Sequence, residues 1–328
     1  MQTLITKGEA NSISEGANII KEGGIVAFPT ETVYGLGANA LDGNAVSSVF
    51  VAKGRPQDNP LICHVSSYEE LLTIAYDDTG IAKVLIDAFS PGPLTLVLKK
   101  RDIVPDTVTA GLSTVAVRIP DHKIALDLIR KSGVPIAAPS ANTSGRPSPT
   151  TAQEVYEDMA GKIPMIIDGG KCDVGIESTV LDVSGEIPVI LRPGRITVEM
   201  LLEHVDNVQL FRGRVVTAAP SPGMKYRHYA TNCEMVLSET PQETMSLYDE
   251  AVRLGKSPVI LALSKNVDFY EGKNFIDVGF DEVELAHNLY TAIREGEKRG
   301  DYIISETVDD YGVGYSVMNR MRKAASKK

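Results

Sequence analysis

Short apolar runs that end in Gly, Pro, Ser or Asn fill the chain up to about residue 212. GGIVAFPT, for example, indicates a strand over residues 25–28 that breaks into a loop. Similar runs are PLICHV, LTLVLKK, STVAVRIP, GVPIAAPSAN, MIIDGG and STVLDVSG. Few long helical patterns separate these runs, so they predict an α/β fold built on a mixed sheet with flanking helices, and not a regular parallel sheet.

Two stretches of this region have the pattern of helices. DGNAVSSVFVAKG places its apolar residues on one helical face, with Asp42 or Asn44 available as the N-cap and Gly54 as the C-terminal stop. TTAQEVYEDMA carries Thr151 and Glu154 at the spacing of a capping box. Both stretches follow segments that carry candidate chemistry.

The residue composition changes at residues 213–231, GRVVTAAPSPGMKYRHYAT, where a Pro/Gly-rich run precedes a cluster of cations and aromatic residues. From residue 232 onward, strand and helix patterns alternate, and the last helix ends in a basic tail. This alternation predicts a small Rossmann-like βαβ domain. We therefore expect a first domain over 1–212, a linker over 213–231 and a second domain over 232–328.

The composition is that of a soluble globular protein, with 43% hydrophobic and 23% charged residues among 328. No apolar run approaches the length of a membrane span, and no signal-peptide pattern is present. Three scattered cysteines form neither a disulfide framework nor a zinc pattern, which predicts a reducing, cytoplasmic location. The formal net charge of -10 argues against broad nucleic-acid binding but is compatible with a local basic pocket.

Two pairs of residues are candidates for binding a phosphate. Lys53 and Arg55 leave a helix end together and could hold phosphate oxygens, although surface cations at a helix C-terminus would give the same pattern. Ser140 and Asn142 stand two apart, so an extended backbone presents both side chains on one face. A Ser/Pro-rich turn is the alternative for the second pair. The sequence has no G-x-x-x-x-G-K-[ST] motif, which excludes a P-loop NTPase.

Polar and basic residues at the ends of other apolar runs complete the candidate chemistry. Thr32, Ser178 and Thr179 could bind a small polar ligand or form ordinary turns. Arg118 and Arg192 lie within or beside apolar strands, where a buried cation needs a partner. An acidic side chain or a substrate carboxylate could be that partner.

Together, PTETVYGLG, KGRPQDNPL, PSANTSGRPSPT and GIESTVLD closely resemble the YrdC-like family of threonylcarbamoyl-AMP synthases over about residues 10–210. SPGMKYRHYA and the C-terminal half resemble the linker and extra domain of its two-domain members. The resemblance implies a nucleotidyltransferase that condenses L-threonine, bicarbonate and ATP into L-threonylcarbamoyladenylate plus pyrophosphate. A tRNA threonylcarbamoyl transferase complex would receive the product, and Mg²⁺ would arrive with ATP without dedicated protein ligands.

The resemblance also implies roles for particular residues, carried over position by position. A linker that folds over the site as a lid would bring two further residues to the nucleotide. The catalytic residues would be Lys53, Arg55, Ser140 and Asn142. Threonine would contact Thr32, His64, Arg118, Ala138 and Ser178. ATP would contact Arg55, Asn59, Thr114, Ser140, Ser148 and Arg192, and from the lid Tyr226 and His228.

Three other functions remain open at this point. An RNA-binding module could use a basic concave surface, and a weak RNA contact is compatible with the synthase as well. The carbamoyltransferase of hydrogenase maturation contains a similar domain, but this chain lacks the paired cysteines of that protein type. The C-terminal half could instead be a regulatory domain, and its sequence indicates no ligand.

Overall fold

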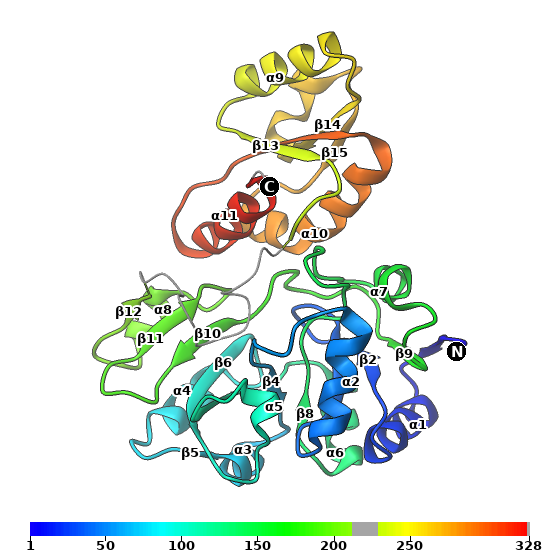
Figure 1. The fold of residues 1–328 in the computed structure, drawn as a ribbon. Helices are drawn as coiled ribbons and strands as arrows, with labels where there is room; N and C mark the ends of the chain where they lie inside the picture. The colour runs from blue at the N-terminus through cyan, green and yellow to red at the C-terminus, as the bar shows by residue number, and fades with distance from the viewer. Residues whose placement is uncertain (212–228, 327–328) are drawn as a thin grey trace. The chain divides into compact units, whose positions relative to one another are not determined.

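The computed structural model describes residues 1–211 and 229–326, which divide into two compact units (Figure 1). The first unit comprises Met1–Ser144, Pro149–Asp173 and the chain that follows Glu177. The second comprises Gly145–Ser148, Val174–Ile176 and the C-terminal part of the chain. Most of the predicted linker, together with Tyr226 and His228, lies outside the described residues, so the predicted domain bounds and the lid stay predictions.

A mixed sheet forms the centre of the first unit, as the sequence predicted. Within residues 1–211 its twelve strands run in the order β1-β9-β2-β3-β8-β4-β7-β6-β10-β11-β12, with β5 paired to β6. The sheet contains both parallel pairs, such as β4–β7, and antiparallel pairs, such as β6–β7. The strands are β1 (Leu4–Lys7), β2 (Val26–Phe28), β3 (Gly35–Asn39), β4 (Ile62–His64), β5 (Ala75–Tyr76), β6 (Leu94–Lys100), β7 (Thr114–Arg118), β8 (Ile136–Ala137), β9 (Met165–Asp168), β10 (Thr179–Asp182), β11 (Val189–Arg192) and β12 (Gln209–Leu210).

Helices flank this sheet, and both helices predicted from their capping signals are present. The Asp42 carboxylate accepts the first N–H groups of α2, and Gly54 ends that helix with a φ of 62°, where glycine carries little strain. Thr151 and Glu154 form the predicted capping box of α7. The helices are α1 (Ala10–Lys21), α2 (Gly43–Lys53), α3 (Tyr68–Ile74), α4 (Ile81–Phe89), α5 (Asp106–Thr109), α6 (Lys123–Ser132), α7 (Ala152–Met159) and α8 (Val198–Leu202).

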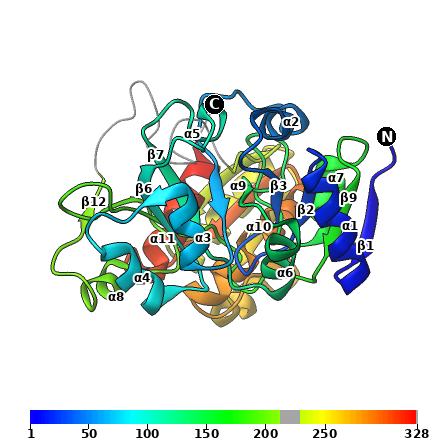
Figure 2. The same cartoon turned by 90° about the horizontal axis from the view of Figure 1, so that it is seen from below.

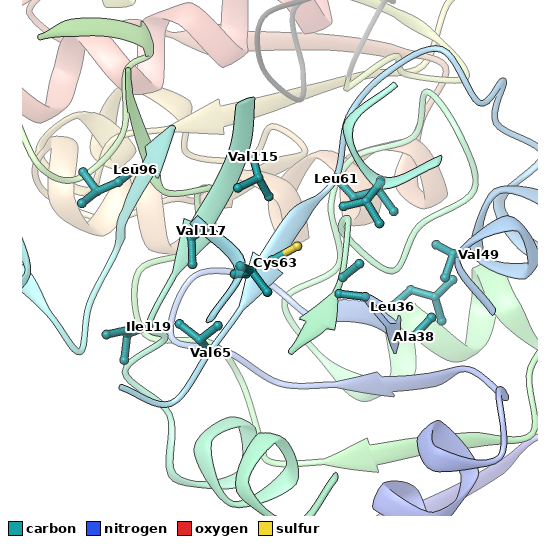
Figure 3. Close-up of a cluster of buried hydrophobic side chains, with 14 of the residues drawn as sticks. Leu36, Ala38, Val49, Leu61, Cys63, Val65, Leu96, Val115, Val117 and Ile119 are labelled. Carbon is teal, nitrogen blue, oxygen red and sulfur yellow. The ribbon is translucent and has the colours of Figure 1, made fainter. Parts of the chain in front are cut away.

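Buried apolar side chains cover both faces of the sheet. Leu36 of β3, Val49 of α2 and Val117 of β7 belong to the large cluster drawn in Figure 3. Val26 and Phe28 of β2 point into a second cluster that α1 and α6 cover. Figure 2 shows β1 and β12 at opposite ends of the sheet. Among the predicted site residues, His64 and Arg118 therefore lie on strands that are fixed by packing on both sides.

The second unit contains the predicted parallel sheet, in the order β13-β16-β14-β15 (Figure 1). Its elements are β13 (Glu234–Ser238), α9 (Pro241–Arg253), β14 (Pro258–Ala262), the 3-10 helix η1 (Ser264–Tyr270), β15 (Phe275–Asp277), α10 (Glu282–Arg299), β16 (Tyr302–Glu306) and α11 (Gly312–Ala325). The prediction of a small Rossmann-like domain is thus confirmed, and η1 is an addition that the sequence pattern did not predict.

Ion pairing and hydrogen bonds attach the segment Gly145–Ser148 to α10 within the second unit. The guanidinium of Arg146 donates both Nη atoms to the Glu297 carboxylate, each at 2.8 Å. Arg294 donates from Nη2 to the carbonyl oxygen of Pro147 at 2.5 Å. This bidentate pairing fixes the direction as well as the distance of the contact.

None of the helices in the described residues is long and apolar enough to cross a lipid bilayer.

Candidate functional site

Lys53, Ser140 and Asn142, which the sequence predicted to act together, lie in contact. The buried ammonium of Lys53 donates to the carbonyl oxygens of Ser140 at 2.5 Å and of Asn142 at 2.6 Å. The Ser140 hydroxyl donates to the side-chain oxygen of Asn142 at 2.5 Å. Burial, and then repulsion from Arg55, lowers the pKa of Lys53 well below its usual value. The lysine therefore holds the backbone that presents the serine and the asparagine.

A second backbone contact fixes the segment that carries Ser140 and Asn142. Ser140 forms an isolated antiparallel bridge with Gly35 at the start of β3. The N–H of Ala141 donates to the carbonyl oxygen of Tyr34 at 2.8 Å, and the N–H of Leu36 donates to that of Pro139 at 2.8 Å. The motifs PTETVYGLG and PSAN are thus paired as neighbouring backbone segments, although more than a hundred residues separate them.

Arg118 is the centre of the predicted threonine-binding group. It ends β7 and is 5% exposed. Its guanidinium donates to the Thr32 hydroxyl at 2.9 Å and to the carbonyl oxygen of Gly92 at 3.3 Å. A third contact, 2.6 Å long, joins Nη2 to the Glu31 carboxylate. Glu31 is therefore the acidic partner that the buried Arg118 needs. Neither the strand pattern nor the motif spacing predicted this pairing.

His64 lies beside Arg118 because β4 and β7 are parallel and pair these two residues in register. The imidazole is buried, and its Nδ1 has no hydrogen-bond partner among the described residues. Burial, followed by repulsion from Arg118, lowers the pKa of His64 to about 3. The ring is therefore neutral at physiological pH, and its unpaired nitrogen is available to a ligand.

Ser178 lies next to this group through β6. Thr95 of β6 is opposite Arg118 in the antiparallel pair, and its hydroxyl is 2.7 Å from the Ser178 hydroxyl. Arg192 donates from Nη2 to both the carbonyl and the hydroxyl oxygen of Ser178, at 3.0 and 3.1 Å. Gly194 permits the close approach of this segment, because a Cβ there would lie 2.3 Å from the N atom of Thr179. The structure thus joins Ser178 and Arg192 directly.

Arg55, Asn59 and Thr114 are the next residues of the predicted nucleotide-binding group. Arg55 donates to the Asn59 carbonyl oxygen at 3.4 Å and stacks over Phe50. Asn59 is fully buried, and neither atom of its side-chain amide has a hydrogen-bond partner among the described residues. Thr114 begins β7, at the opposite end of that strand from Arg118. A buried amide without a partner is costly and is commonly explained by a ligand.

Two further predicted residues are buried and differ in their surroundings. Ala138 follows β8, and its N–H donates to the carbonyl oxygen of Ile62 at 2.9 Å, so it borders the strand that carries His64. Ser148 is 2% exposed and belongs to the segment that packs within the second unit.

A cavity of about 780 Å³ lies elsewhere on the first unit, between α2 and the segments around Ile25 and Pro164. Apolar side chains such as the exposed Val51 line it together with serine, threonine and lysine side chains. Among the described residues, Lys53 is the member of the predicted site that borders it.

Both parts of the chain match known protein families. Residues 18–194 match the Sua5, YciO and YrdC family described as "Telomere recombination". Residues 196–326 match the family described as "Threonylcarbamoyl-AMP synthase, C-terminal domain". The two matches together leave out residues 1–17, residue 195 and the last two residues of the chain.

Similar proteins cover nearly the whole chain. A protein of Pyrococcus abyssi named threonylcarbamoyl-AMP synthase is 47% identical, over 94% of this chain and 92% of its own length. A Bacillus subtilis protein of the same name is 44% identical, over 95% and 92%. The crystal structure of P. abyssi Sua5 complexed with L-threonine matches with a TM-score of 0.91 at 45% identity, covering 99% of this chain and 97% of that one.

Proposed function

This chain belongs to the two-domain family of threonylcarbamoyl-AMP synthases, and we propose that its first unit joins L-threonine, bicarbonate and ATP into threonylcarbamoyl-AMP with release of pyrophosphate and water, the water leaving when bicarbonate and the threonine amine form the carbamate. One observation carries the assignment of the site. The PTETVYGLG motif contacts both predicted groups, since Gly35 pairs with Ser140 and the Thr32 hydroxyl accepts a hydrogen bond from the buried Arg118. The activity is that of a nucleotidyltransferase.

Threonine binds at the Arg118 end of the site in this proposal. Its carboxylate pairs with the guanidinium of Arg118, and the Thr32 and Ser178 hydroxyls lie beside the same group. The neutral imidazole of His64 offers its Nδ1 to a substrate hydroxyl or amine. Ala138 borders this end through its contact with β4.

The nucleotide lies along Arg55, Asn59, Ser140 and Arg192 in this proposal. The unpaired amide of Asn59 and the guanidinium of Arg55 are suited to a phosphate or ribose oxygen. Thr114, Ser148, Tyr226 and His228 complete the proposed contacts with ATP.

Transfer of the adenylyl group requires positioning and charge stabilisation more than a covalent nucleophile. The carbamate oxygen attacks the α-phosphorus, the bond from that phosphorus to the bridging oxygen breaks, and pyrophosphate leaves. Lys53 fixes the carbonyl groups of Ser140 and Asn142, and their side chains then face the reacting phosphate. Removal of a donor of this kind typically costs about 10²–10³ in rate.

The described residues contain no group of three or more His, Cys, Asp or Glu side chains that could hold a metal ion. The proposed reaction is written without a protein-held magnesium ion. Mg²⁺ that accompanies the triphosphate stays an expectation.

We also propose a cytoplasmic location for the protein, which the three free thiols support. In this proposal the product passes to a tRNA threonylcarbamoyl transferase complex, and the protein makes at most a weak contact with RNA.

The test is release of pyrophosphate from ATP with a panel of amino acids, each with and without bicarbonate. We expect release that depends on both L-threonine and bicarbonate. Arg118→Lys, which keeps the charge but loses the planar fork, should raise the KM for threonine more than the KM for ATP. Arg130→Lys, the same substitution at an exposed position of α6, is the matched control. Release that ignores threonine or bicarbonate would reject the proposal.

A further inference from the structure

Arg118 and Glu31 form a buried ion pair in the predicted threonine site. Glu31 is 4% exposed and Arg118 is 5% exposed. Their closest atoms, Oε1 of Glu31 and Nη2 of Arg118, are 2.6 Å apart. Since burial of two charges is costly even when they are paired, the pair requires an explanation beyond stability.

The turn that carries Glu31 is held tightly. The hydroxyl of Thr30 accepts hydrogen bonds from the N–H groups of Thr32 and Val33, both at 3.2 Å. This places Glu31 and Thr32 side by side, and both contact the same guanidinium. The backbone thus fixes the Glu31 carboxylate relative to the group that binds the substrate carboxylate.

One oxygen of this carboxylate is available to a ligand. Oε2 of Glu31 is buried and has no hydrogen-bond partner within residues 1–211 and 229–326. An ionised carboxylate oxygen that is removed from water without a donor is costly. A donor with positive charge would compensate that cost most effectively.

The charges of the pair match those of an amino acid. An isolated buried arginine would suit any small carboxylate, because it carries an uncompensated positive charge. Arg118 with Glu31 is neutral overall and presents both signs within a few ångströms. That arrangement is complementary to a zwitterion, whose carboxylate and ammonium groups are attached to one carbon atom.

We propose that Glu31 binds the α-ammonium group of threonine through its Oε2 atom, and so restricts the site to α-amino acids. The inference rests on the proposed function, since it assumes that threonine binds at Arg118. In this arrangement Arg118 takes the substrate carboxylate while it keeps its contact with Glu31. The amine that becomes carbamoylated is then held beside Thr32.

The experiment compares two ligands on the full-length protein at neutral pH by calorimetry. L-threonine carries the ammonium group, and 2,3-dihydroxybutanoate has the same carbon skeleton with a hydroxyl in its place. The wild-type protein should prefer threonine. Glu31→Gln should weaken threonine binding by about 10- to 100-fold, the equivalent of one charge-assisted hydrogen bond, and should not weaken binding of the hydroxy acid.

Glu154→Gln is the matched control, because Glu154 is also buried but accepts backbone hydrogen bonds at the start of α7. It should lower stability and leave the ratio of the two affinities unchanged. Equal losses for both ligands in Glu31→Gln would show that Glu31 only positions Arg118, and would overturn the proposal.

The wild-type protein provides a test that does not depend on the folding of any variant. Equal affinity for the two ligands would also overturn the proposal. Pyrophosphate release by the wild-type protein separates the two failures. An active enzyme with no preference for the ammonium group rejects this inference alone, whereas an enzyme without threonine-dependent release rejects the proposed function.

Discussion

Replacement of Lys53 by methionine tests whether this residue supports the backbone of the Ser140–Asn142 segment. Methionine has nearly the same length, so it fills the space and removes only the ammonium group. The carbonyl oxygens of Ser140 and Asn142 then lose donors at 2.5 and 2.6 Å. A third, longer contact of 3.5 Å to the Asn142 side-chain oxygen is lost as well, and the two short hydrogen bonds dominate the perturbation.

The expected loss follows from these two contacts. A buried carbonyl group left without its donor costs about 1–3 kcal/mol, so two of them cost about 2–6 kcal/mol. Removal of the buried ammonium group, whose pKa burial lowers, offsets part of that cost. We expect a net loss of about 2–3 kcal/mol in the free energy of unfolding, which corresponds to a fall of about 4–12 °C in the Tm of a unit of this size.

Two assays follow the change. Thermal unfolding gives the global effect, and hydrogen exchange gives its location. The N–H groups of Ala141 and Ser144 donate to Tyr34 and Lys53, so peptides that contain them should exchange faster in Lys53→Met. Lys131→Met, at an exposed position, should change neither measurement.

A different role for Lys53 would give a different result. A lysine that contacts only the phosphates of ATP can be removed without loss of stability, and active-site charges often destabilise the free protein. An inactive Lys53→Met variant that is as stable as the wild-type protein, with unchanged exchange at residues 139–144, would refute the supporting role of Lys53.

Three further changes test other parts of the structure. The folded-state pKa of His64, about 3, lies below the unfolded value of about 6.5, so stability is complete above pH 6.5 and is lost as the pH falls toward 3; urea unfolding of His64→Asn should show a shallower acid dependence, and an unchanged slope would contradict this. Gly194→Ala should displace Ser178 and reduce pyrophosphate release at least tenfold, since the new Cβ meets the backbone of the Ser178 segment; wild-type kinetics would exclude the clash. Glu297→Ala should lower the free energy of unfolding by about 3 kcal/mol, because it leaves Arg146 without its bidentate partner; calorimetry that shows no loss would contradict the contact.

Local signals predicted the elements of the fold that depend on neighbouring residues. The capping residues Asp42 and Thr151 and the terminal Gly54 lie where the sequence indicated, because helix ends are fixed by contacts within a few residues. The alternation after residue 232 likewise predicted a parallel sheet, which the structure contains. The helices α1 and α6 were not predicted, although they cover one face of the large sheet.

Contacts between distant segments could not be predicted in the same way. The sequence indicated that Arg118 needs a partner, but the choice of Glu31 depends on how the Thr30–Val33 turn meets the end of β7. Similarly, the contacts of the Lys53 ammonium group with two backbone carbonyls were not predicted, and its expected contact with a phosphate stays a prediction. The rule that buried charges are paired could have identified Glu31, since it lies beside Thr32 in the same motif.

The central claim is that residues from distant segments bind ATP and threonine in one site. A crystal structure of the protein with L-threonine and a non-hydrolysable ATP analogue tests it most directly. The threonine carboxylate should lie on Arg118, and phosphate oxygens should lie within hydrogen-bond distance of Arg55 and Ser140. A triphosphate bound away from these side chains, for example in the cavity beside α2, would contradict the account.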